Sequence, residues 1–306
     1  MLIRFIKKTP TLKFLENSKL FFVISALLSF ISIIFLLVTG LNFGIDFKGG
    51  LLIEIATKNN IETIEIRKKL GDTVPGDFSI QSLDNSKNNY LIKIETNVTE
   101  DKDNQKLIIK IKDSLNSTYE AVEYRRLEYV GPTVSKELIR AGILSILIAI
   151  SAMLVYIWFR FELPFAVGAV IALIHDIILT VGMFSITSLE FNLATVAAIL
   201  LIIGYSMNDT VVVYDRVREN IKKFRKISTI ALLNKSVNET LSRTINTTAT
   251  TILALLALFI FGGNIIKDFS FAMIWGILIG TYSSILIATP VLVFLNLKRS
   301  QSKEEQ

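Results

Sequence analysis

The sequence predicts a multi-pass α-helical membrane protein with six transmembrane helices and one α+β domain inserted after the first of them. Of its 306 residues, 51% are hydrophobic, and they gather in long runs. A helix that crosses a bilayer needs about 20 consecutive apolar residues. One such run lies near the start of the chain, and the others fill most of it after residue 138. The segment between them has an ordinary soluble composition, so it reads as a water-exposed domain.

The first apolar run, residues 20–41, contains no charged side chain. A cleaved signal peptide has a shorter apolar core of roughly 7–15 residues, followed by a cleavage site flanked by small residues. This run is longer and continues into Asn42-Phe43-Gly44 without such a site. We therefore predict a retained transmembrane helix, preceded by an N-terminal segment, residues 1–19.

The inserted domain, residues 42–138, alternates between strand-like and helix-like periodicity. Apolar residues at every second position, or in short β-branched runs, indicate strands, and apolar residues three and four apart indicate helices. Strands are expected at 51–55, 78–83, 90–94 and 121–130, and helices at 61–70 and 107–115. The resulting βαββαβ order is that of a ferredoxin-like sandwich.

Five further apolar runs form the predicted membrane domain, residues 139–297. They cover residues 139–159, 164–186, 193–214, 245–261 and 269–297. Most are close to the length of a single span, and the last is long enough to tilt or to extend beyond the bilayer. A short polar tail, residues 298–306, follows.

Lysine and arginine residues predict the orientation. They cluster before residue 20, in the link between the fourth and fifth runs, and after residue 297, whereas the loops 188–192 and 262–268 contain only Lys267. Cytoplasmic loops carry the excess of Lys and Arg, and long domains cross largely regardless of charge. We therefore expect a bacterial inner-membrane protein with both termini in the cytoplasm and residues 42–138 in the periplasm, or outside the cell if there is only one membrane.

The composition argues against several functions. There is no cysteine and only one histidine, so thiol chemistry is excluded and a His/Cys metal site is not expected. Basic residues lack the aromatic interleaving of a nucleic-acid surface. Gly49-Gly50 is not followed by the Lys-Ser pair of a phosphate loop, and no nucleophile–base set is evident. We therefore expect no metal, no cofactor, no nucleic acid and no enzymatic activity.

The fourth span contains an acid, Asp209, within its apolar stretch. A charge at the bilayer centre costs about 2.5–3.5 kcal/mol on insertion scales, so an intramembrane acid is by default a functional candidate. Asn208 precedes it, and Tyr205 lies one turn earlier on the same face. The alternative is an Asp that binds neighbouring helices as polar glue; we favour a proton-carrying role.

The fifth span begins with Arg243 and a polar stripe. Thr244, Thr247, Thr248 and Thr251 recur at helical spacing. The stripe suits either a hydrated path or close packing against another helix. Arg243 suits either a partner for Asp209 or an interface anchor whose side chain reaches the headgroups.

The third span contains His175 and Asp176 between isoleucine and leucine residues. Two ionisable groups inside a span are consistent with a proton relay, since histidine titrates near neutral pH. They are equally consistent with a hydrogen-bonded pair that joins two helices.

Together these motifs resemble the SecD/SecF family of protein-export membrane proteins, and within it the SecF type. The matching segments are 44–50 (GIDFKGG), 130–132 (VGP), 172–176 (ALIHD), 204–209 (GYSMND), 214–220 (YDRVREN), 243–244 (RT), 261–263 (FGG) and 280–284 (GTYSS). They extend over nearly the whole chain, and the stretch from 204 to 220 is the most specific. Ser135 departs from the glycine that many relatives carry there.

The resemblance implies an accessory subunit of the Sec protein translocase. Such a protein pairs with SecD, another six-span protein, and the two resemble one transporter of the resistance-nodulation-division superfamily. They use the proton motive force to promote export of an unfolded polypeptide that emerges from the SecYEG channel across the lipid membrane. The family's proton-carrying acid and its arginine correspond to Asp209 and Arg243.

Two alternatives remain at this point. One is half of a different proton-driven exporter of the same superfamily. The other is a non-transporting scaffold of the translocon, for which Asp209 would be dispensable.

Overall fold

The computed structural model describes residues 10–74, 78–83, 88–95 and 101–295. The chain divides into two compact units. One unit contains residues 43–143 together with 190–193, and the other contains the remaining described residues. The predicted tail, residues 298–306, and residues 1–9 of the predicted N-terminal segment lie outside the described part.

The inserted unit follows the predicted order of strands and helices. Its main elements are β2 (Gly50–Ala56), α3 (Thr63–Gly71), β3 (Phe78–Ser82), β4 (Asn89–Ile94), α4 (Asp101–Asn116) and β5 (Glu123–Val130). The four strands pair antiparallel in the spatial order β3-β4-β2-β5. Two short strands, β1 (Asn42–Phe43) and β6 (Glu190–Phe191), form a separate ladder. The unit therefore includes a chain segment that lies far outside the predicted range 42–138.

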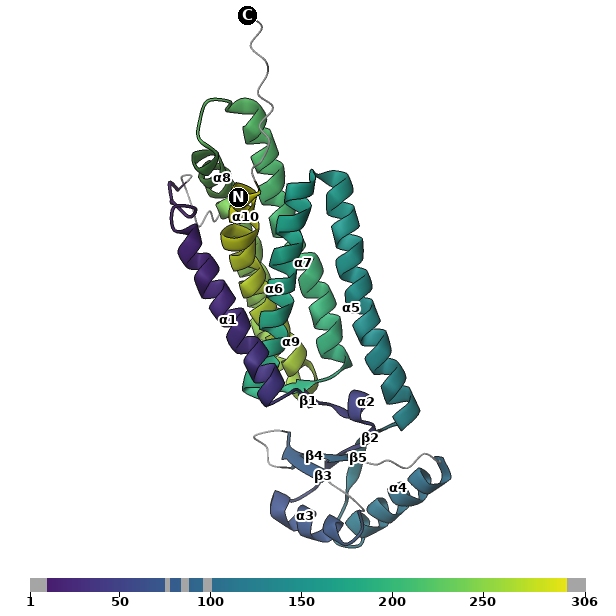
Figure 1. The fold of residues 1–306 in the computed structure, drawn as a ribbon. Helices are drawn as coiled ribbons and strands as arrows, with labels where there is room; N and C mark the ends of the chain where they lie inside the picture. The colour runs from purple at the N-terminus through teal and green to yellow at the C-terminus, as the bar shows by residue number, and fades with distance from the viewer. Residues whose placement is uncertain (1–9, 75–77, 84–87, 96–100, 296–306) are drawn as a thin grey trace, which may run out of the picture. The chain divides into compact units, whose positions relative to one another are not determined.

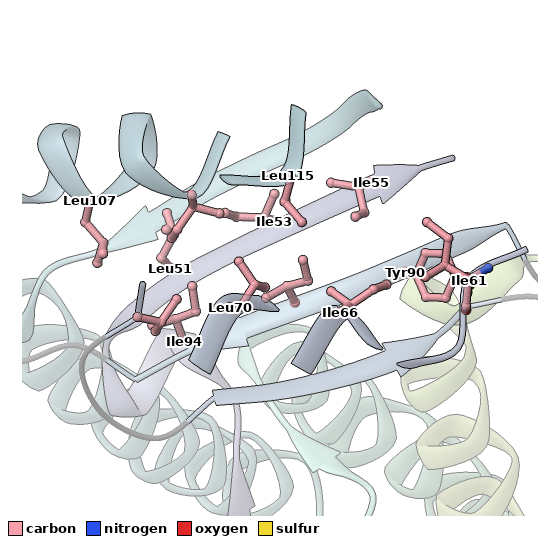
Figure 2. Packing of buried hydrophobic residues seen from close by; sticks show 13 residues of the cluster. Leu51, Ile53, Ile55, Ile61, Ile66, Leu70, Tyr90, Ile94, Leu107 and Leu115 are labelled. Carbon is pink, nitrogen blue, oxygen red and sulfur yellow. Dashed lines mark hydrogen bonds between the residues drawn. The ribbon is translucent and has the colours of Figure 1, made fainter. Parts of the chain in front are cut away.

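The hydrophobic core of this unit lies between the sheet and its two helices (Figure 2). Strand β2 contributes Leu51, Ile53 and Ile55, and β4 contributes Tyr90, Ile92 and Ile94, each set at every second residue. Alternation of this kind places one face of each strand on the core. The facing helices supply Ile66 and Leu70 from α3 and Leu107, Ile111 and Leu115 from α4. Full burial of each large apolar side chain contributes about 1.5–3 kcal/mol.

The Gly49-Gly50 pair makes the turn that leads into β2. A one-turn helix, α2 (Ile45–Lys48), precedes it. Gly50 has a φ of +138°, and a Cβ atom there would lie 2.3 Å from the carbonyl oxygen of Ile94. Only glycine adopts this backbone conformation readily and leaves the neighbouring strand in place.

Six helices are long and apolar enough to cross a membrane in the described part of the chain. They are α1 (Ser18–Val38), α5 (Pro132–Arg160), α6 (Leu163–Thr187), α7 (Leu193–Lys223), α8 (Thr229–Phe261) and a final span, Ile266–Phe294. The chain is accordingly an integral membrane protein. Helices α5, α7 and α8 are longer than the apolar runs that predicted them.

The final span is not one regular helix. It consists of α9 (Gly263–Ser283), a π-helical segment η1 (Ser284–Ala288) and α10 (Thr289–Phe294). Thr289 donates its hydroxyl to the carbonyl oxygen of Ser284 at 2.9 Å. The sequence predicted one uninterrupted span over 269–297, because an apolar run reveals length and not the hydrogen-bonding register. π-helical turns occur frequently at functional sites.

Helices α6 and α7 and the final span are the most buried of the six apolar helices. Figure 1 shows α1 running alongside α6, and these helices meet where Gly182 packs against Ser32. Helix α9 approaches α7 closely at two glycines one turn apart. A Cβ atom on Gly276 would lie 2.2 Å from Ile202, and one on Gly280 would lie 2.8 Å from Ser206. Small residues four apart permit this close helix–helix approach within a membrane.

Candidate functional site

Asp209 lies in the middle of α7 and is almost completely buried, with 3% of its surface exposed. Its Oδ2 atom has no hydrogen-bond partner among the described residues. A buried carboxylate without donors is poorly stabilised as an anion. The side chain can therefore change between a neutral and a charged form without breaking a hydrogen bond at Oδ2.

Arg243, on α8, is a cation whose charge acts on Asp209. The two side chains nevertheless form no ion pair within 4.0 Å in the described structure. Arg243 is exposed at the surface of the isolated chain. The arrangement therefore brings the two predicted residues into electrostatic interaction, and direct contact would require one of the side chains to move.

The threonines of the predicted stripe on α8 make hydrogen bonds to two different neighbouring helices. Tyr205 of α7 donates its hydroxyl to Thr251 at 3.3 Å, whereas Thr248 shares a 2.9 Å hydrogen bond with Thr281 of α9. Thr247 donates to the carbonyl oxygen of Arg243 at 3.1 Å. Part of the stripe thus packs helices together, and the hydroxyl of buried Thr244 has no described partner.

Asn208 faces a different direction from Asp209. It is exposed, whereas Asp209 is buried. Adjacent residues on a helix point about 100° apart, so the two cannot line one face. The structure places Asn208 on the outer surface of α7.

His175 and Asp176, on α6, form a second polar centre. Nδ1 of His175 lies 3.0 Å from Oδ1 of Asp176. The other carboxyl oxygen, Oδ2, accepts hydrogen bonds from Ser206 of α7 at 2.6 Å and Ser283 of α9 at 2.8 Å. Asp176 therefore joins three helices, and the predicted pair is hydrogen-bonded.

Sequence reasoning missed the hydroxyl groups that surround this centre. Besides Ser206 and Ser283, Thr210 and Ser284 share a 2.9 Å hydrogen bond between α7 and η1. Serine and threonine are common in membrane helices, so their presence alone gave no signal. Their grouping depends on which faces of α7 and α9 meet.

The end of α7 carries a third group of charges, outside the apolar stretch. Asp215 pairs with Arg160 at 3.0 Å, and Arg216 pairs with Glu219 at 2.9 Å. Asn220 donates to Ser236 and to Glu239 of α8, both at 2.9 Å. These contacts link the ends of α5, α7 and α8, and exposed pairs of this kind contribute about 0–1 kcal/mol each.

Within the described residues, no cluster of three or more His, Asp or Glu side chains lies close enough to hold a metal ion. What the bundle does offer is two buried carboxyl groups in contrasting surroundings and one imidazole. These features define a class: multi-pass integral membrane proteins that keep ionisable groups inside a helical bundle.

Comparison with known proteins shows which family within this class the chain resembles. Residues 110–298 match the family described as protein export membrane protein SecD/SecF, C-terminal, and residues 34–61 match the SecD/SecF GG motif. Two similar proteins are named protein translocase subunit SecF. That of Rickettsia rickettsii is 45% identical over 93% of this chain and 92% of its own length. That of Rickettsia typhi is 42% identical over 97% and 96%.

A solved structure shares the fold. The crystal structure of SecDF, a translocon-associated membrane protein from Thermus thermophilus, superposes with a TM-score of 0.83 at 33% identity. The match covers 94% of this chain and 39% of the SecDF chain. The chain belongs to the SecD/SecF family of protein-export membrane proteins, and the resemblance to SecF that its motifs indicated is confirmed.

Proposed function

We propose that the chain is the SecF-type accessory subunit of the bacterial Sec protein translocase. In this role it acts with a SecD-type partner and uses the proton motive force to promote export of unfolded proteins across the inner membrane. The proposal draws on the near full-length similarity to translocase subunits named SecF. The observation that carries the mechanism is the buried, incompletely partnered carboxyl group of Asp209 on α7.

Two opposing effects determine the proton affinity of Asp209. Burial favours the neutral acid, whereas the positive charge of Arg243 favours the carboxylate. Any movement of α7 relative to α8 alters the distance between these two side chains and therefore changes proton affinity. A change of one pKa unit corresponds to about 1.4 kcal/mol, and one charge that crosses 100 mV corresponds to about 2.3 kcal/mol. One proton per cycle is thus enough to bias a two-state helix arrangement.

The predicted orientation of the chain in the membrane gives the direction of proton movement. With both termini in the cytoplasm, Asp209 takes up a proton from the periplasmic side and releases it towards the cytoplasm. Tyr205 of α7 and Thr251 of α8, which are hydrogen-bonded to each other, and Thr247, one turn before Thr251, provide polar groups along this route. The inserted unit then lies in the periplasm. We assign it to the ferredoxin-like class, because its element order and the strand order β3-β4-β2-β5 match that topology.

The need for a partner follows from the outer surfaces of α7 and α8. Asn208 and Arg243 are exposed in the isolated chain, and polar groups that face hydrocarbon are costly. A second set of helices that covers these faces removes this cost. The match covers 39% of the SecDF chain to which this chain is similar. The SecYEG channel and the emerging polypeptide are the further partners that we propose.

Two other functions make different predictions. Another proton-driven exporter of the same superfamily would also need Asp209 but would not act on export through the Sec channel. A scaffold of the translocon would need the fold but not the acid. No arrangement of the described residues favours an enzyme.

The test is the substitution Asp209→Asn, which keeps the size of the side chain and removes its ability to titrate. Export of a preprotein in membrane vesicles is measured with and without a proton gradient. The variant should assemble with its partner and lose most of the stimulation by the gradient. Asp215→Asn is the matched control, since Asp215 lies on the same helix in a partly exposed ion pair, and it should keep that stimulation. Full gradient dependence with Asn at 209 would favour the scaffold.

A further inference from the structure

The segment GIDFKGG, residues 44–50, contains an acid, Asp46, that is not part of the Asp209 site. Asp46 lies on the short helix α2, and its Oδ2 atom accepts a hydrogen bond from the backbone N–H of Leu193 at 2.9 Å. Leu193 is the first residue of α7, the helix that carries Asp209. The two bonded residues are 147 positions apart in the sequence. An acid of the inserted unit therefore holds the beginning of this helix.

The hydrogen bond satisfies a requirement of the helix end. The first N–H groups of an α-helix have no partner within the helix, and the N-terminus of a helix favours a nearby carboxylate. Residues 193–196, the first turn of α7, include no acid. Asp46 supplies a carboxylate acceptor to this end of α7 from a distant part of the chain.

Aromatic packing fixes the segment that precedes α7. The N–H of Gly44 donates to the carbonyl oxygen of Phe191 at 2.9 Å, which joins β1 to β6. The ring centroid of Phe191 lies 6.0 Å from that of Phe43, edge to face, and 6.0 Å from that of Phe47. Aromatic pairs at these separations are favourable beyond the area that they bury. The residue two positions before α7 is therefore packed from two sides.

The neighbouring side chain, Glu190, is held as well. It forms an ion pair with Lys93 of β4, and both side chains are largely buried. A Cβ atom on Gly44 would lie 2.5 Å from Oε1 of Glu190 and 3.2 Å from Cβ of Asn192, so the two segments lie close together. Residues 190–193 accordingly belong to the same compact unit as residues 43–143.

We infer that Asp46 is a positioning residue that couples the start of α7 to the inserted unit. Leu193 and Asp209 lie on one continuous helix, about 24 Å apart along its axis at 1.5 Å per residue. A movement of α7 that accompanies protonation of Asp209 displaces Leu193, and the hydrogen bond to Asp46 transmits this displacement to the inserted unit. The inference rests on the proposed function for the role of Asp209, whereas the hydrogen bond can be measured without export.

Hydrogen exchange measures the bond directly. The full-length chain is placed in lipid nanodiscs with its SecD-type partner, and exchange at the amide of Leu193 is followed by mass spectrometry. Asp46→Ala removes the acceptor and should accelerate this exchange several-fold. Asp46→Asn keeps an acceptor oxygen and should retain most of the protection. Asp72→Ala, at an exposed acid in the same unit, is the control and should change nothing. Equal protection in Asp46→Ala and the wild type would overturn the inference.

Proton conductance and export, measured on the same variants, separate coupling from a structural role. Asp46→Ala leaves Asp209 in place, so it should keep proton conductance in liposomes and lose most of the gradient-dependent stimulation of export. Asp46→Asn should keep both. A residue that only supports the fold would lower conductance and export together, and that result would contradict the inference.

Leu193→Pro tests the same bond from the donor side, because proline has no N–H and is well accepted at the first position of a helix. It should reproduce the loss of export in Asp46→Ala, and the double variant should lose no more than either single variant. Leu193→Ala keeps the N–H and is the matched control. If Asp46→Ala does not fold, Leu193→Pro against Leu193→Ala decides, and equal export in these two variants would overturn the inference.

Asp209→Asn shows which of the two proposals fails. If Asp209→Asn conducts protons and exports like the wild type, the proposed function is wrong and the coupling inference falls with it. If Asp209→Asn is defective as expected while Asp46→Ala and Leu193→Pro export normally, the coupling inference alone is wrong.

Discussion

Two buried aspartates in this bundle show how neighbouring side chains determine the role of an acid. Asp176 makes three side-chain hydrogen bonds, whereas Oδ2 of Asp209 makes none among the described residues. The first environment stabilises one protonation state, and the second leaves the two states closer in free energy. Asp209 is therefore the better candidate for a proton that binds and leaves in each cycle.

Arg243 provides a finer test at the residue level. It acts on Asp209 without an ion pair within 4.0 Å, so we expect its charge to matter more than the planar shape of its guanidinium group. Arg243→Lys should keep most of the gradient-dependent export. Arg243→Gln should reduce it about tenfold or more, which is the factor equivalent to one pKa unit. Export rates of the two variants in matched vesicles provide the measurement. An equal and complete loss in both would mean that a bidentate contact forms during the cycle.

The sequence identified some of these residues and could not identify others. A charged residue inside an apolar run is visible in any sequence, so Asp209, Asp176 and His175 were predicted as candidates. Ser206 and Ser283 were not, because a serine becomes informative only when its partner on another helix is known. Asn208 was grouped with Asp209 because the two are adjacent, yet it lies on the exposed side of α7.

At the level of elements, the contact between α7 and α9 brings Ser206 and Ser283 together at Asp176. Gly276 and Gly280 let the helices approach, and Ser206 lies opposite Gly280. Length and apolarity were enough to predict the six spans. They did not reveal the π-helical segment η1, residues 284–288.

Substitution of Gly280 tests this contact. Even a Cβ atom would come within 2.8 Å of the Ser206 Cβ, so Gly280→Val must push the two helices apart. Overpacking typically costs about 1–3 kcal/mol, and we expect a lower temperature of unfolding in detergent. Gly204→Ala is the control, because a Cβ atom there meets nothing within 4 Å. Unchanged thermal stability of Gly280→Val would show that α9 is not held against α7 in this way.

At the level of the whole molecule, composition and spacing predicted a helical membrane unit with one inserted α+β unit. The short β6 strand, residues 190–191, was not predicted as part of the inserted unit, because it lies about 50 residues beyond the predicted boundary. Pairing between distant segments has no local signature in a single sequence. The predicted orientation of the chain in the membrane is based on the distribution of Lys and Arg.

Cysteine labelling tests that orientation without background, since the chain has no cysteine. Asn59, in the inserted unit, and Lys226, in the link between α7 and α8, are both exposed. In intact spheroplasts an impermeant thiol reagent should label Asn59→Cys and not Lys226→Cys. The reverse pattern would place the inserted unit in the cytoplasm and refute the proposed topology.

Proton movement through the assembled complex is the property on which the proposed function depends. The chain and its SecD-type partner are reconstituted in liposomes that contain a pH-sensitive dye, a gradient is imposed, and the rate of internal pH change is recorded. We expect conductance with Asp209, and conductance close to that of protein-free liposomes with Asp209→Asn at equal incorporation. If both complexes conduct protons at the same rate, Asp209 does not carry the proton and the proposed mechanism is wrong.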